Sequence, residues 1–393
     1  MKYFDTYVSN TTAGSGSQTV FFSDNAPHTG RVFYRVTTGG KFNYSFLFTN
    51  IIDSTFADGS VTRKNYVVDS WNIISARVAT CQSLNFEKVC APAKEKGEEP
   101  SVTMGCFPSE NQDHIVVSAF KEITFNGNIE KEVGPAEFFA TDPIELELDA
   151  GEYVCLEITY RGNVIPHHAE SIVPVFVKNG SRWDYSKLMP FPAMVGIDRK
   201  VDKKICYIGD SITQGCGTAI NSYTHWNAVL TEMLPKENAY WNHAYGYARA
   251  SDAASNGAWL FKVRQNDYAV VCYGVNDLFH EYVADSATVV KNIKSHLTEI
   301  VEKLQAANTK VLIQTIPPFD YPEEIAEMWR EINAYIRTEL SKKADAFFDN
   351  VPVLSENGDP DCPKARYGGH PDAIGCKAWA NALKDTMLEF ISK

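Results

Sequence analysis

Apolar and polar residues alternate with a period of two along the first half of the chain. The segment IELEL at residues 144–148 is the clearest case, because every second side chain is apolar. Alternation of this kind is typical of β-strands with one buried face. Comparable segments, separated by Gly, Asp, Asn and Pro turns, lie at 31–36, 42–48, 71–78, 114–120, 153–160 and 172–177. The first half therefore predicts a β-sandwich of jelly-roll type, with no helix before about residue 195.

Short apolar runs and helical periodicity alternate in the second half. The run KKICYIG at 203–209 is typical of a buried parallel strand. Similar runs follow at 239–244, 268–274, 310–316 and 346–351. Between the runs, apolar residues recur at helical spacing at 226–233, 289–304, 325–336 and 379–390. This order predicts a flavodoxin-like three-layer α/β/α domain around a five-stranded parallel sheet.

Two boundaries follow from local signals. Ser286 precedes the helical stripe at 289–304 and is the expected N-cap of that helix. The segment 190–204, with its prolines, glycine and mixed charges, is typical of a linker. We therefore expect two domains, at 1–195 and 196–393.

Composition excludes several functional classes. The chain has 393 residues and a formal net charge of −12, which argues against binding to the phosphate backbone of nucleic acid. No apolar stretch approaches the roughly 20 residues of a membrane-spanning helix. The first residues lack the apolar region of a secretory signal, and the nine cysteines form no C-x-x-C pair. We expect a cytoplasmic protein with free thiols and without a metal site, cofactor or phosphate-binding loop.

A serine lies where the first parallel strand of the second half ends. It is Ser211, in YIGDSITQGCGT at residues 207–218. Open parallel sheets bind ligands beyond the carboxyl ends of their strands, so three other segments should meet Ser211 there. They are NHAYGYARA at 242–250, YGVND at 273–277 and YGGHPDAIG at 367–375, where His370 and Pro371 are expected in the first turn of the last helix. Taken alone, Ser211 is an ordinary turn former or helix cap, so its neighbours decide its role.

In order along the chain, these four segments resemble the motifs of the SGNH hydrolase family, the GDSL-type esterases. The family's Gly-Asp-Ser, second-block glycine, Gly-x-Asn-Asp and His-Pro are matched here by Ser211, Gly246, Asn276 and His370. The resemblance covers roughly residues 200–393 and implies a serine esterase with Ser211 as nucleophile and His370 as its base. It further implies an oxyanion hole made by the backbone N–H groups of Ser211 and Gly246 and the side-chain amide of Asn276. The β-rich half is more loosely similar to the sandwich module that precedes this fold in some carbohydrate esterases.

The sequence departs from the family pattern at the triad acid. The family has an Asp three residues before its catalytic His, and this position is Tyr367. Three explanations stay open. His370 is held by a backbone carbonyl in a Ser-His dyad, or Asp359 or Asp361 supplies the acid, or the domain is catalytically impaired.

A second departure concerns the oxyanion hole. The family glycine falls five residues after the Asn of the second block, whereas Gly246 falls four residues after Asn242. The fifth position is Tyr247. Because the expected donor is a backbone N–H, we keep Gly246 as the donor while Tyr247 remains an alternative.

Other polar residues have simpler interpretations. Asp210 is expected to hold the turn before Ser211, and Asn276 taken alone fits an Asx turn. His280 falls in a predicted loop or helix start and competes only weakly for the role of base. His167 and His168 belong to the first domain and are expected at its surface or at an interface.

Three functions compete for this sequence. The favoured one is an esterase that removes small acyl groups, above all acetyl, from a carbohydrate, with Trp259 and Tyr273 as candidate sugar-stacking side chains. The second is a lysophospholipase- or lipase-like esterase with an apolar acyl pocket. The third is a carbohydrate-binding relative that has lost catalysis. The substrate is thus expected to be a small-molecule or oligosaccharide ester, and the sequence does not predict the oligomeric state.

Overall fold

A computed structural model describes residues 2–14, 25–51, 70–84, 88–90, 106–108, 115–167, 172–186, 189–255, 258–280 and 285–393. Within these ranges the side chains of 88–90, 106–108, 258, 259 and 280 are not described. The chain divides into two compact units, unit 1 with residues 1–200 and 219–221, and unit 2 with residues 201–218 and 222–393. The boundary expected between residues 195 and 196 lies inside a strand of unit 1, β14 (Met194–Ile197).

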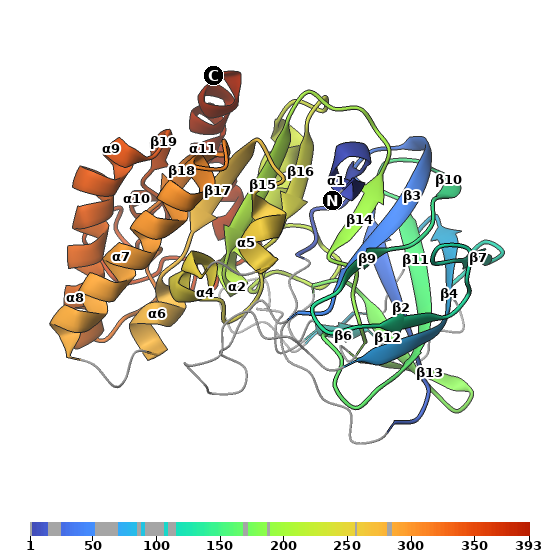
Figure 1. Cartoon of the computed structure of the whole chain (residues 1–393). Helices are drawn as coiled ribbons and strands as arrows, with labels where there is room; N and C mark the ends of the chain where they lie inside the picture. The colour runs from blue at the N-terminus through green and yellow to red at the C-terminus, as the bar shows by residue number, and fades with distance from the viewer. Residues whose placement is uncertain are drawn as a thin grey trace. The chain divides into compact units, whose positions relative to one another are not determined.

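Unit 1 consists mainly of two antiparallel sheets (Figure 1). The first has the order β1 (Val8–Ser9), β14, β3 (Gly40–Thr49), β10 (Ile144–Leu148), with β9 (Phe138–Ala140) also paired to β3. The second has the order β13 (Arg182–Tyr185), β12 (Val175–Asn179), β2 (His28–Arg35), β11 (Tyr153–Arg161), β4 (Trp71–Cys81), β7 (Lys121–Ile123), with β8 (Lys131–Val133) also paired to β4. A small pair, β5 (Lys88–Cys90) and β6 (Cys106–Pro108), and one helical turn, α1 (Tyr3–Thr6), complete the described elements. The arrangement is consistent with a β-sandwich.

The larger sheet of unit 1 is covered on both faces. On one face, Val32, Leu156 and Val78 lie side by side on β2, β11 and β4 and are fully buried. On the other face a second apolar cluster is formed by Phe33, Ala79, Cys81, Tyr153, Cys155 and Phe176, and residues of the segment 115–120 pack against it. Two-sided burial explains why the apolar residues of these strands are denser than a simple alternation predicts.

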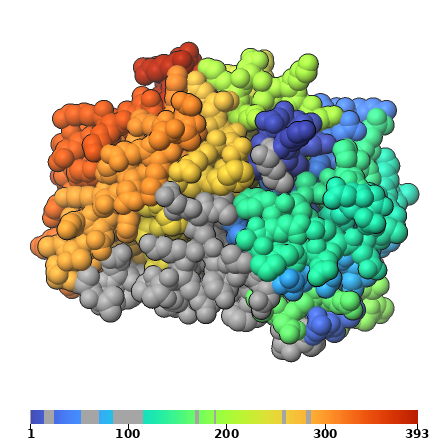
Figure 2. Space-filling view, in the orientation of Figure 1, coloured from blue at the N-terminus to red at the C-terminus, as the bar shows by residue number. Residues whose placement is uncertain are grey.

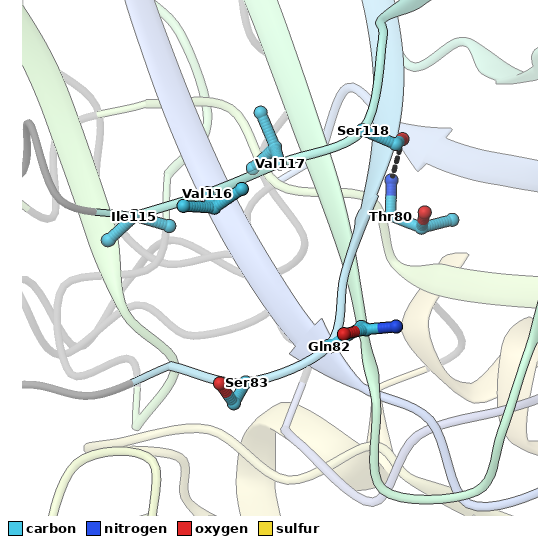
Figure 3. Close-up of a pocket in the computed structure, with 7 residues that line it drawn as sticks. All are labelled: Thr80, Gln82, Ser83, Ile115, Val116, Val117 and Ser118. Atoms are coloured by element: carbon cyan, nitrogen blue, oxygen red, sulfur yellow. Dashed lines mark hydrogen bonds between the residues drawn. The ribbon is translucent and has the colours of Figure 1, made fainter.

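The segment 115–120 was expected to be a strand, and this expectation is wrong. Its backbone makes one bond to β4, from the N–H of Ser118 to the carbonyl of Thr80 at 2.8 Å. The N–H of Thr80 donates to the Ser118 hydroxyl at 2.9 Å. In a regular antiparallel pair this N–H would donate to a backbone carbonyl, so the serine side chain replaces that carbonyl. Figure 3 shows this contact beside a cavity of about 470 Å³ lined by Thr80, Gln82, Ser83 and residues 115–118.

Unit 2 contains the five-stranded parallel sheet that the sequence predicts. Its order is β16 (Ala239–Asn242), β15 (Lys204–Gly209), β17 (Tyr268–Cys272), β18 (Lys310–Gln314), β19 (Ala346–Phe348). Strands β15 to β18 are almost entirely buried, as their continuous apolar runs require, whereas the edge strand β19 is half-buried. The chain reverses its direction of travel across the sheet at β15, and this is the place where ligands bind in folds of this type.

Helices cover both faces of this sheet. The helices are α2 (Ser211–Gln214), α3 (Trp226–Met233), α4 (Ala250–Ala254), α5 (Ala258–Val263), α6 (Val275–His280), α7 (Ser286–Gln305), α8 (Glu323–Tyr335), α9 (Ser341–Lys343), α10 (Val351–Leu354) and α11 (Ala373–Ser392), and a π-helical segment, Ile336–Leu340, continues α8. Because right-handed crossovers lead from β15 to β16 in one direction and onward from β17 to β19 in the other, α3 and α7 lie on opposite faces. α3 packs against α11, whereas α7 packs against α4 and α8. α7 and α8 cover their face of the sheet in Figure 1 and hide it in the space-filling view of Figure 2.

Two helix starts differ from expectation by one or two residues. Asp285, and not Ser286, is the N-cap of α7, because its carboxylate accepts the N–H of Thr288 at 3.0 Å. α11 begins at Ala373 behind the N-cap Asp372, so His370 and Pro371 precede the helix. None of the helices in the described ranges is long and apolar enough to cross a membrane.

Candidate active site

Ser211 lies directly beyond the carboxyl end of β15, the strand at which the chain reverses direction. Asp210 is the N-cap of α2 and accepts the backbone N–H of Ile212 at 3.0 Å, as expected for a residue that holds the turn. Two backbone N–H groups, those of Gly215 and Cys216, donate to the Ser211 carbonyl at 3.0 and 2.9 Å. The serine is thus held on a short helical turn whose backbone bonds are satisfied locally.

His370 meets Ser211 as the sequence predicts. The Ser211 Oγ and the His370 Nε2 lie 2.8 Å apart, although 159 residues separate them. The Phe319 ring packs edge-on against the imidazole, with centroids 5.2 Å apart. The contact has the geometry in which an imidazole takes the proton of a serine hydroxyl.

Gly217 lets the serine and histidine segments approach this closely. Its φ is +100°, and a Cβ at this position would lie 2.7 Å from the His370 carbonyl oxygen and 2.6 Å from that of Pro371. Any other residue would strain the backbone and push the histidine segment away. The sequence interpretation missed this role, although the glycine is visible in the string QGCGT.

The second and third blocks also meet at this edge. The N–H of Tyr245 donates to the Gly209 carbonyl at 3.4 Å, which joins the second block to the end of β15. The Asn276 amide donates from Nδ2 to the Ala248 carbonyl at 3.0 Å. This bond spans 28 residues, so Asn276 is not a local Asx-turn residue. One hydrogen of the Nδ2 group is used in this way, and the amide is fixed in orientation by it.

Gly246 and Tyr247 occupy the two central positions of a turn closed by a 3.4 Å bond from the Ala248 N–H to the Tyr245 carbonyl. Positive φ falls on Tyr247, at +62°, and not on Gly246. A turn with positive φ at its third residue is of type II, and it ordinarily has Gly or Asn there. The glycine-like conformation therefore lies five residues after Asn242, which is the spacing of the family pattern. The role of Gly246 as oxyanion donor stays a prediction.

Two buried carboxyl groups lie behind the serine. Asp277 is fully buried and accepts the N–H groups of Ala250 and Ser251 at 2.9 and 3.4 Å. Burial raises the pKa of Asp277 to about 7. Burial also raises the pKa of Asp210 to about 7, and the nearby Asp277 carboxyl raises it further. These two groups contact the backbone of the first and second blocks, so they support the loops that carry the site.

The candidate triad acids are engaged elsewhere. The Asp361 carboxylate lies 3.4 Å from Arg337 and is largely exposed. The Asp359 carboxylate accepts the backbone N–H of Asp361 at 2.9 Å. Tyr367, at the family position of the acid, packs partly buried against the core of unit 2. Their assignment as triad acids stays a prediction, and among the described residues no group of three or more His, Cys, Asp or Glu side chains could hold a metal ion.

The remaining expectations have mixed outcomes. Tyr273 is 1 % exposed, so it is not a surface for sugar stacking. His167 is buried rather than at the surface, and burial lowers its pKa to about 4. The side chains of Trp259 and His280 and the whole of His168 lie outside the described part of the structure.

Comparison with known proteins identifies similarities to one class of enzyme. Residues 207–378 match the model of the GDSL-like lipase/acylhydrolase family. Among solved structures, a psychrotrophic esterase from Pseudoalteromonas sp. is 19% identical with a TM-score of 0.37, over 49% of this chain and 100% of that chain. An acetylxylan esterase from Geobacillus stearothermophilus is 19% identical with a TM-score of 0.38, over 49% of this chain and 97% of that chain. No curated protein sequence matches the chain at the threshold applied.

Proposed function

We propose that the chain is a serine ester hydrolase that removes acetyl groups from a carbohydrate, since residues 207–378 match the model of the GDSL-like lipase/acylhydrolase family. The observation that supports catalysis most directly is the 2.8 Å contact between Ser211 Oγ and His370 Nε2. A binding protein without catalysis would not need this contact, whose partners come from opposite ends of the domain.

The reaction proceeds through an acyl-enzyme. His370 accepts the proton of Ser211 as the hydroxyl oxygen attacks the ester carbonyl. The resulting oxyanion is stabilised by the backbone N–H of Ser211, an N–H of the turn at Gly246 and the amide of Asn276. The tetrahedral intermediate expels the alcohol, which takes the proton from His370. Water, deprotonated by the same imidazole, then releases the acid and regenerates the serine.

A small acyl group is supported by the burial of the reacting groups. Ser211 and Asn276 are each 9% exposed, so the carbonyl carbon must approach a surface with little open space around it. An acetyl group fits such surroundings more readily than a long acyl chain. The antiparallel unit 1 supports a carbohydrate as the alcohol part, because sandwich modules accompany this fold in some carbohydrate esterases.

An acyl-chain-length series tests this proposal. Aryl esters from acetyl to octanoyl are compared with purified protein and with Ser211→Ala, and Ser255→Ala serves as a control. We expect kcat/KM to be highest for acetyl, and Ser211→Ala to lower it by at least about 10⁴-fold. Faster turnover of long chains would identify a lipase-like enzyme instead, and equal rates in wild type and Ser211→Ala would remove Ser211 from the mechanism.

A further inference from the structure

Tyr247 combines two features that are unusual for a tyrosine. Its φ of +62° is in the left-handed region, which a side chain with a Cβ adopts only at a cost. Its side chain is 37% exposed, whereas most aromatic residues of unit 2 are buried. Strained residues that persist in a folded protein cluster at ligand-contacting sites.

The position of Tyr247 is fixed relative to the reacting serine. Two residues before it, Tyr245 is bonded to Gly209, which lies two residues before Ser211. One residue after it, Ala248 accepts the amide of Asn276. The turn is therefore tied on one side to the nucleophile strand and on the other to the candidate oxyanion donor.

Among the described residues, five large apolar or aromatic side chains are exposed, and three belong to unit 2: Tyr247, Phe261 and Ile374. Of these three, Tyr247 is the one that lies between the bonds to Gly209 and Asn276. The acyl group points toward the buried Ser211, so the alcohol part of an ester must extend toward solvent. An exposed ring at this edge would meet the alcohol part.

We propose that Tyr247 is a specificity-determining residue whose ring packs against the alcohol part of the substrate, a sugar ring, beside the Ser211–His370 pair. The inference rests on the proposed function. The C–H face of a pyranose offers an apolar surface that matches the flat face of a tyrosine. Glycine would adopt the turn without strain, so the backbone conformation does not account for a tyrosine here and the contact made by its side chain does.

The variant Tyr247→Gly separates the ring from the backbone. It keeps the N–H of the turn and relieves the left-handed strain, so loss of folding is not expected. The measured quantity is a ratio of kcat/KM values for two acetates, an acetylated methyl glycoside and an acyclic alkyl acetate. We expect this ratio to fall about 10-fold in Tyr247→Gly, mainly through KM, and to stay within twofold in Tyr247→Phe.

Asn308→Gly is the matched control. Asn308 has a φ of +64° and precedes β18, at the opposite edge of the sheet from Ser211. Glycine replaces a left-handed residue there too, with less strain to relieve because asparagine tolerates this conformation, and the ratio should stay unchanged. An unchanged ratio in Tyr247→Gly would overturn the proposal, even if both acetates are hydrolysed as the proposed function requires.

A binding measurement distinguishes failure of the inference from failure of the proposed function. The unacetylated methyl glycoside is titrated by calorimetry into wild type, Tyr247→Gly and Ser211→Ala. We expect the Kd to rise about 10-fold in Tyr247→Gly and to be unchanged in Ser211→Ala. If wild type hydrolyses neither acetate but shows this pattern, the proposed function is wrong and the ring contact stands. Equal Kd values in wild type and Tyr247→Gly would overturn the ring contact.

Discussion

Buried polar groups are organised differently in the two units. In unit 1, Glu157 of β11 lies between Arg31 of β2 and Arg77 of β4, with N–O distances of 2.5 Å to each. The guanidinium carbons lie over aromatic rings, Arg31 4.1 Å from the Trp183 centroid and Arg77 4.3 Å from the Phe120 centroid. The Glu157 carboxylate is thus paired with an arginine on each side, and each guanidinium group is covered by an aromatic ring.

In unit 2, two buried polar residues of the candidate site, Ser211 and Asn276, lie just beyond the carboxyl ends of β15 and β17. The Ser211 carbonyl accepts two backbone N–H groups while its Oγ contacts His370 Nε2, and the Asn276 amide donates to the Ala248 carbonyl. The comparison teaches that burial alone does not mark a site. A polar group whose partners all lie within one sheet stabilises that sheet. A polar group beyond the end of a strand, held through its backbone, keeps side-chain atoms that are able to act on a substrate.

The largest effect is expected from the histidine. His370→Ala should lower kcat by at least about 10⁴-fold, or roughly 5 kcal/mol, because Ser211 loses its base. KM and the thermal midpoint should change little. Steady-state kinetics with an aryl acetate measure this, and His28→Ala in unit 1 is the control. A small effect on kcat would place the base elsewhere.

The buried carboxyl pair should make stability depend on pH. The folded-state pKa of about 7 for Asp210 and Asp277 lies above the ordinary 3.8, so the folded state holds protons that the unfolded state has released. The pair therefore contributes stability that is fully present below about pH 4 and is lost as the pH rises through about 7.

Urea titrations between pH 4 and 8 measure this slope. Asp277→Asn should at least halve the pH-dependent loss of unfolding free energy. It removes one titrating carboxyl, and it also removes the charge that helps to raise the pKa of Asp210. Asp285→Asn, the cap of α7, should leave the slope between pH 4 and 7 as in wild type. A slope identical in wild type and Asp277→Asn would contradict the assignment.

Gly217→Ala tests how closely the two catalytic segments must approach. The new Cβ would collide with the His370 and Pro371 carbonyls, and a displacement of about 1 Å costs about 10² in kcat. Gly358→Ala is the matched control, since φ there is also positive, at +76°, while the nearest atom lies 3.6 Å away. Both variants should lose some stability, and only Gly217→Ala should lose turnover. Equal kcat values in the two would show that the approach is not needed.

The smallest effect concerns the ion cluster of unit 1. Glu157→Gln should lower the free energy of unfolding by about 2 kcal/mol, less than for a fully buried pair because the Arg77 side chain is 49% exposed. Glu145→Gln removes a carboxylate whose pair with Lys41 is exposed, so it should leave the free energy of unfolding almost unchanged. Chemical denaturation measures both, and kcat per folded molecule should be unaffected.

Much of unit 2 was predictable because its signals are local. Five apolar runs predicted the five strands of the parallel sheet, and four motifs at the strand ends predicted the contact between Ser211 and His370. The glycine-like turn at Tyr247 was not predictable, since tyrosine carries no signal for positive φ. In unit 1 the segment 115–120 has strand composition, yet a single serine hydroxyl diverts its pairing with β4.

The ion cluster also bears on how the strands of unit 1 find their alignment. Sliding β11 by one residue against its neighbours would turn Glu157 to the opposite face, among Val32, Val78 and other fully buried apolar side chains, and leave both arginines without a carboxylate. The cost of that error is far larger than the net stabilisation by the native pair. The cluster therefore affects the choice of strand register more than the stability of the native sheet, because it destabilises misaligned sheets by more than it stabilises the aligned one.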